Sequence, residues 1–161
     1  MKSSKSSSSS KSAPYEFLKT LLNTPSPSGF ETRGQKVWVD YVSQFADSVE
    51  IDSYGNAYAT LNPTGDPTVF MSGHVDELGF MIAHISDDGF LSIRGIGGVD
   101  NTLVRGQRVN VHGAQGPVPG VTGLLAIHMQ ELDERKKVPD LHAMHIDIGV
   151  SSRKEAEKLV S

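Results

Sequence analysis

Apolar residues recur at helical spacing in the first part of the chain. One stripe covers residues 15–22 and predicts a short amphipathic helix that ends at the Asn-Thr-Pro of residues 23–25. A second stripe predicts a longer helix at residues 31–45 with one buried face. Between them, Pro-Ser-Pro-Ser-Gly at residues 25–29 predicts a loop, because prolines lack a backbone donor and glycine permits sharp bends.

The next segments have the residue pattern of β-strands. Residues 49–52 and 57–61 flank a Tyr-Gly-Asn turn and predict a hairpin. Residues 68–72, Thr-Val-Phe-Met-Ser, form a short apolar run between turn signals, which is typical of a central strand buried on both faces. A His-Val-Asp-Glu sequence, residues 74–77, follows just past its end.

Beyond Glu77 the chain changes to short apolar runs punctuated by glycines, which predicts a small β barrel or sandwich and a domain boundary near Glu77. The expected strands are residues 80–85, 90–94, 108–111, 118–122 and 143–149. Ser152 and Glu155 have the spacing of a capping box and predict a final helix.

Composition narrows the class of protein. The 161 residues include 16 glycines and 8 prolines, which favours a mixed α/β protein with many turns. The net charge of -4 gives no basic field, so we expect no nucleic-acid partner. No cysteine is present, so any metal must be held by His, Asp or Glu.

The sequence predicts neither an ordinary secretory signal nor a membrane span. Residues 1–13 are rich in Ser and Lys, and no apolar run follows before Pro14, so we expect a disordered tail and no ordinary secretory signal. No stretch of 18 apolar residues occurs, and we therefore expect no membrane partner.

His74 and Asp76 are the candidate site. Residues two apart on an extended chain point the same way, and ligands bind outside the carboxyl ends of strands in open α/β sheets. A metal-binding imidazole usually gives its second N–H to a carboxylate. The pair therefore predicts a metal ligand, His74, with its orienting group, Asp76. The competing interpretation is an ordinary histidine at a strand end and an aspartate that begins a turn, since His-x-Asp alone is a weak motif.

Six stretches of the chain carry a resemblance to a known family. They are residues 25–31, 72–81, 84–85 with 87–91, 97–100, 103–109 and 146–157. In these stretches, and in their order along the chain, the sequence resembles the M42 aminopeptidases, also called glutamyl or deblocking aminopeptidases. The resemblance runs from about Tyr15 to the last residue.

The resemblance implies an α/β metallopeptidase catalytic domain interrupted by a small, β-barrel-like dimerisation domain. Residues 14–77 would open the catalytic domain, residues 78–150 would be the insertion, and residues 151–161 would start a helix that returns to the catalytic domain. It further implies two divalent metal ions, zinc or cobalt, peptide substrates, a homo-oligomer built through the β-rich domain, and a cytoplasmic location. His74 would be a metal ligand, and Asp76 the catalytic-site residue that orients it. No residue is expected to bind any other cofactor.

The other residues that the family requires match segments that would follow Ser161. They are a bridging aspartate, a glutamate acting as general base, and the remaining ligands. A two-metal site needs carboxylates that bridge both ions and a base that activates water. We therefore expect the chain by itself to hold at most one metal ion weakly and to be inactive. The alternative is a catalytically inactive fragment that acts as an assembly or interaction module.

Other motifs are better explained by structure. His145 and Asp147 repeat the His-x-Asp spacing, but Met144, Ile146 and Ile148 alternate with them as the core face of a strand. The remaining histidines have no carboxylate at ligand spacing: His84, His112, His128 and His142. Glycoside hydrolysis ranks last, since the only close acidic pair among the strands, residues 87–88, belongs to an Asp-Asp-Gly turn.

Overall fold

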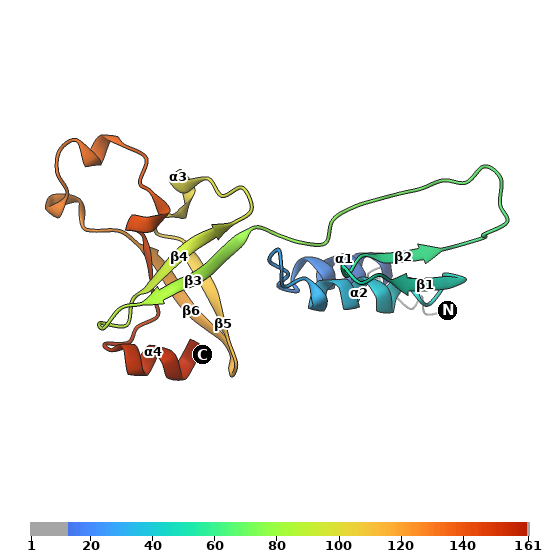
Figure 1. Cartoon of the computed structure of the whole chain (residues 1–161), viewed down its shortest axis with the longest axis horizontal. Helices are drawn as coiled ribbons and strands as arrows, with labels where there is room; N and C mark the ends of the chain where they lie inside the picture. The colour runs from blue at the N-terminus through green and yellow to red at the C-terminus, as the bar shows by residue number, and fades with distance from the viewer. Residues whose placement is uncertain (1–12, 161) are drawn as a thin grey trace, which may run out of the picture. The chain divides into compact units, whose positions relative to one another are not determined.

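Two helices and a hairpin form the N-terminal part of the chain in this computed structural model, which describes residues 13–160 (Figure 1). The predicted helices are α1 (Ala13–Leu22) and α2 (Thr32–Val42). Their apolar stripes face each other, because the rings of Phe17 and Tyr41 stack with centroids 3.9 Å apart. Both helices are thus confirmed, although α2 ends three residues before the expected residue 45.

The predicted hairpin is also present. Strands β1 (Ser48–Ile51) and β2 (Ala57–Thr60) pair antiparallel, with Ile51 opposite Ala57. In the turn, the Asp52 carboxylate accepts hydrogen bonds from the backbone N–H groups of Tyr54 and Asn56, each 2.9 Å long. This is how a short acidic side chain stabilises a tight turn.

The prediction of a buried central strand at residues 68–72 is wrong. The segment lies outside every helix and strand, and its apolar side chains are exposed, Phe70 by 78%. A strand buried on both faces needs neighbours for its backbone groups and for its side chains. The β1–β2 hairpin is the only sheet among the described residues of this unit, so the segment has no strand to pair with here.

A second compact unit begins at Leu78 and is built on one five-stranded antiparallel sheet. Its strands lie in the order β3-β4-β7-β6-β5. Their bounds are β3 (Gly79–Ile85), β4 (Leu91–Ile96), β5 (Arg108–Gly113), β6 (Gly116–Gly123) and β7 (His145–Asp147). The five expected strands are therefore confirmed, but the closed barrel or two-sheet sandwich is not. Among residues 78–160, β3 and β5 each pair on one side only, which makes the sheet an open half-barrel.

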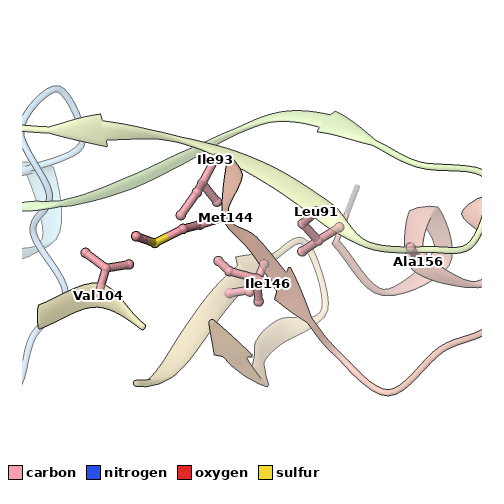
Figure 2. Close-up of a cluster of buried hydrophobic side chains, with 7 residues drawn as sticks. Leu91, Ile93, Val104, Met144, Ile146 and Ala156 are labelled. Carbon is pink, nitrogen blue, oxygen red and sulfur yellow. The ribbon is translucent and has the colours of Figure 1, made fainter. Parts of the chain in front are cut away.

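One face of this sheet carries the core of the second unit. Figure 2 shows side chains from β4 and β7 converging with those of two helices. The buried cluster is Leu91, Ile93, Val104, Val111, Met144, Ile146 and Ala156. Helix α3 (Asn101–Val104) was not predicted from the sequence, and it contributes Val104. Helix α4 (Arg153–Val160) contributes Ala156.

The predicted capping box opens α4. The Glu155 backbone N–H donates to the Ser152 hydroxyl over 3.3 Å, and the Glu155 carboxylate accepts from the Ser151 N–H over 2.9 Å. The first contact satisfies a backbone donor that the first turn of a helix leaves free, and the second holds the residue just before the cap.

The segment between β6 and β7 has little regular structure. It contains three single turns of 3-10 helix, η1 (Ile127–Met129), η2 (Glu134–Lys136) and η3 (Leu141–Ala143). No helix within residues 13–160 is both long and apolar enough to cross a membrane. Residues 1–12 of the expected tail lie outside the described residues, and Ala13 is already the first residue of α1.

Candidate metal-ligand site

The structure brings the two predicted site residues into contact. The His74 Nδ1 lies 2.9 Å from the Asp76 Oδ1 and 3.0 Å from the Asp76 carbonyl oxygen. Both oxygens are acceptors when the carboxyl is ionised, so Nδ1 must carry the proton and donate it. In the neutral ring, Nε2 then keeps its lone pair. The His74 side chain is 85% exposed, so this lone pair is open to a ligand from outside.

The loop at residues 25–29, between α1 and α2, holds the His-x-Asp segment in place. Pro27 forms a parallel bridge with Glu77, whose backbone N–H donates to the Ser26 carbonyl over 2.9 Å. The Ser28 N–H donates in turn to the Glu77 carbonyl over 3.2 Å. The Glu77 carboxylate is occupied as well, because it accepts from the Ser26 N–H over 2.9 Å. Since prolines have no N–H, the donors of the Pro-Ser-Pro-Ser loop are its two serines.

Helix α2 packs closely against the same loop. Ser26 is 3% exposed, and its hydroxyl donates to the Thr24 carbonyl over 3.1 Å. A Cβ at position 34 would collide with the Ser26 hydroxyl and press on Val75. Gly34 therefore allows the close approach of helix and loop, which places the candidate site on a packed support.

The structure adds a third residue that the sequence analysis missed. The Ser28 hydroxyl donates to the Asp76 Oδ2 over 2.5 Å. This bond, followed by the bond from His74, holds the pKa of Asp76 below its ordinary value. Asp76 is thus ionised at neutral pH and accepts from both neighbours. The Pro-Ser-Pro-Ser-Gly loop was noticed in the sequence, but nothing there indicates that it would meet a residue 48 positions away.

His74 and Asp76 do not belong to a complete metal centre within residues 13–160. No group of three or more His, Asp or Glu side chains in that range could hold a metal ion. The second His-x-Asp sequence lies on β7, where Ile146 is buried, as is Met144 just before the strand, and the His145 ring packs edge-on against Phe90 at 4.6 Å. This agrees with the expected core strand. His84 Nε2 contacts the Arg153 guanidinium at 3.2 Å.

Comparison with known proteins identifies the family. The family model for M42 glutamyl aminopeptidases matches residues 55–161, a span that includes His74, Asp76 and the five-stranded sheet. The chain belongs to the M42 family. The resemblance seen in the sequence is therefore confirmed.

Individual M42 relatives and solved structures agree over nearly the whole chain. It is 34% identical to the lysyl aminopeptidase of Pyrococcus furiosus over 148 residues, which are 90% of this chain and 42% of that protein. The TET aminopeptidase of a marine sediment archaeon of the Thaumarchaeota superposes with a TM-score of 0.87 and 35% identity, over 93% of this chain and 43% of that one. The Pyrococcus horikoshii TET1 peptidase gives a TM-score of 0.77 and 34% identity, over 91% of this chain and 44% of that one.

These comparisons support the mixed α/β fold. The M42 chain described here spans about two fifths of the length of these relatives.

Proposed function

We propose that this M42 chain forms part of a metal-dependent aminopeptidase that removes N-terminal residues from peptides, with His74 as a ligand of one of two divalent ions, zinc or cobalt. The observation that carries the proposal is the 2.9 Å contact between His74 Nδ1 and Asp76 Oδ1, which leaves Nε2 free. A metal-binding histidine normally has this arrangement, in which the carboxylate fixes the tautomer and the ring orientation.

The described residues fit one position of such a site and no more. An imidazole with its orienting carboxylate suits zinc or cobalt. When bound, a metal pair supplies an activated water and polarises the scissile carbonyl. Within residues 13–160 Asp76 holds the proton on Nδ1 of His74, and no cluster of three ligands is present. We therefore propose that the bridging carboxylate, the general base and the other ligands belong to polypeptide outside these residues.

The same proposal gives different parts of the chain different tasks. Residues 14–77 would be part of the α/β catalytic domain, residues 78–150 an inserted dimerisation domain, and residues 151–161 a return to the catalytic domain. Self-association is supported by the relative from Pyrococcus horikoshii, which can assemble into a tetrahedron or a large octahedral shell. A cytoplasmic location belongs to this proposal as well.

A second candidate function is an assembly module without catalytic activity. It is favoured by the lack, among residues 13–160, of any group of three or more His, Asp or Glu side chains that could hold a metal ion. In that case the five-stranded unit would associate with a partner, and His74 would have no metal to bind.

Metal titration separates the two candidates. Isothermal titration of zinc into the 161-residue chain should show weak binding to one site that His74→Ala removes. His128→Ala is the matched control, because His128 is an exposed histidine in η1 of the other unit. This control should bind zinc as the unaltered chain does. Absence of zinc binding, or equal binding by His74→Ala, would contradict the ligand role and favour the assembly module.

A further inference from the structure

We infer that Ser28 is a positioning residue, which acts through Asp76 to keep the His74 imidazole in the tautomer whose Nε2 is free. The contacts form a chain: the Ser28 hydroxyl donates to Asp76 Oδ2 over 2.5 Å, and Asp76 Oδ1 faces His74 Nδ1 over 2.9 Å. The importance of that tautomer for metal binding rests on the proposed function, whereas the tautomer itself follows from the contacts.

The carboxylate needs both contacts to stay oriented. The terminal torsion of an aspartate side chain has a broad, roughly two-fold profile, so a carboxylate held at one oxygen still rotates. Here each oxygen of Asp76 has its own partner, Ser28 on one side and His74 on the other. Because Ser28 fixes Oδ2, Oδ1 remains directed at the imidazole N–H.

Ser28 is itself held at a defined place by a tight turn. The Phe30 N–H donates to the Pro27 carbonyl over 2.8 Å, which closes a four-residue turn with Ser28 at its second position. Gly29, at the third position, has a φ of +87°, a conformation that favours glycine. The Gly29 N–H also donates to the Glu31 carboxylate over 2.6 Å. The turn therefore presents the Ser28 hydroxyl from a constrained backbone.

The hydroxyl of Ser28 is separable from the contacts that dock the loop. Docking uses the backbone of Ser26 and Ser28, together with the backbone and carboxylate of Glu77. None of these contacts involves the Ser28 side chain. Removing the hydroxyl should consequently leave the loop in place and free only the Asp76 carboxylate. His74 Nδ1 would then keep the Asp76 carbonyl, 3.0 Å away, as its only fixed acceptor. The ring would therefore populate more of the tautomer with a proton on Nε2, in which Nε2 has no lone pair for a metal.

Nitrogen-15 NMR of the histidine rings in the metal-free 161-residue chain reads this tautomer directly. The unaltered chain should show His74 with its proton on Nδ1. Ser28→Ala should shift His74 toward a mixture of tautomers, and Ser28→Thr should restore the original signals because it keeps the hydroxyl. Zinc affinity should fall by about 10- to 100-fold in Ser28→Ala, the usual effect of losing a group that orients a ligand. An unchanged His74 tautomer in Ser28→Ala would overturn the inference.

Ser26→Ala is the matched control, since it removes a hydroxyl from the same loop that bonds to Thr24 and not to Asp76. It should leave the His74 signals unchanged, and a shift as large as in Ser28→Ala would overturn the inference. Amide exchange at Glu77 reports whether the loop stays docked. If Ser28→Ala undocks the loop, Ser28→Cys is measured as well, because its thiol fills the same space and is a weak donor. Undocking in both variants would show that the side chain holds the loop, which also overturns a separate positioning role.

The readout distinguishes this inference from the proposed function. The tautomer is measured without metal, so an unaltered chain that binds no zinc counts against the ligand role of His74 alone. A His74 tautomer that is the same in Ser28→Ala and in the unaltered chain counts against the role of Ser28 alone.

Discussion

Leu91→Ala should destabilise the second unit strongly and leave the first unit unaffected. Leu91 is the first residue of β4, it is 0% exposed, and it lies in the buried cluster between the sheet and α4. Truncating a buried leucine to alanine costs about 2–5 kcal/mol, through lost burial and the cavity left behind. At about 1.4 kcal/mol for each factor of ten, amides that exchange by unfolding of this unit should exchange roughly 30- to 4,000-fold faster.

Hydrogen exchange followed by mass spectrometry measures this change segment by segment. Peptides from β3 to β7 should lose protection in Leu91→Ala, whereas peptides from α1 and α2 should exchange as before. Leu103→Ala is the matched control, because Leu103 belongs to the same unit and is 66% exposed. An exposed substitution of this kind should change stability by no more than about 0.5 kcal/mol.

The same experiment compares the two units in the unaltered chain. Val42 is the only buried hydrophobic side chain among the described residues of the first unit, whereas the second unit has seven. Regions with few buried apolar contacts open at low free energy. Residues 31–72 should therefore be less protected than residues 78–149. Equal protection of the two ranges, or a parallel loss in α1 and α2 after Leu91→Ala, would show that the units unfold as one.

Three further predictions follow from the site, a helix cap and the unpaired segment. In a complete M42 enzyme that contains these residues, His74→Ala should abolish most activity and Asp76→Asn should lower it by about 10- to 100-fold at limiting metal; wild-type kcat/KM in both variants would contradict the metal role. Hydrogen bonds from Thr102 lower the pKa of Asp100, so the stability that Asp100 contributes should be present above its unfolded pKa and lost as the pH falls through its folded pKa. The melting temperature of Asp100→Ala should therefore differ from that of the unaltered chain at neutral pH and converge with it in acid. A difference that stays constant with pH would contradict this prediction. Phe70→Ser should reduce association of the chain in sedimentation velocity, because it removes an exposed apolar side chain from an unpaired segment; an unchanged sedimentation profile would exclude this segment as the cause of association.

The local elements could be predicted from the sequence because their signals lie within a few residues. The stripe containing Phe17 and the stripe containing Tyr41 have helical spacing, and the two rings stack where the helices meet. The alternation around Ile146 correctly placed a strand whose core face is buried. Such patterns depend on side chains that sit one helical turn or two strand positions apart.

Features that depend on distant partners could not be predicted. The apolar run around Phe70 has the composition of a buried strand, yet pairing is a property of its neighbours, and none is present among residues 13–160. The bond between Ser28 and Asp76 joins positions 48 apart. Helix α3 has only four residues, so it is too short for a periodic signal. The contact of His74 with Asp76 could be predicted because the two residues are neighbours in the sequence. The contact of Ser28 with Asp76 could not, because these residues are distant in the sequence.

A peptidase assay of the purified 161-residue chain, with zinc or cobalt added, is the most direct test of the proposal that this chain holds one ligand of a shared two-metal site. A two-metal site needs carboxylates that bridge both ions and a base that activates water, and residues 13–160 contain no cluster of three ligands. The chain should therefore release no amino acid from aminoacyl-p-nitroanilide substrates at any concentration of either metal. Robust release that requires added metal and is lost in His74→Ala would show that these residues assemble a working centre on their own, and would contradict the proposal.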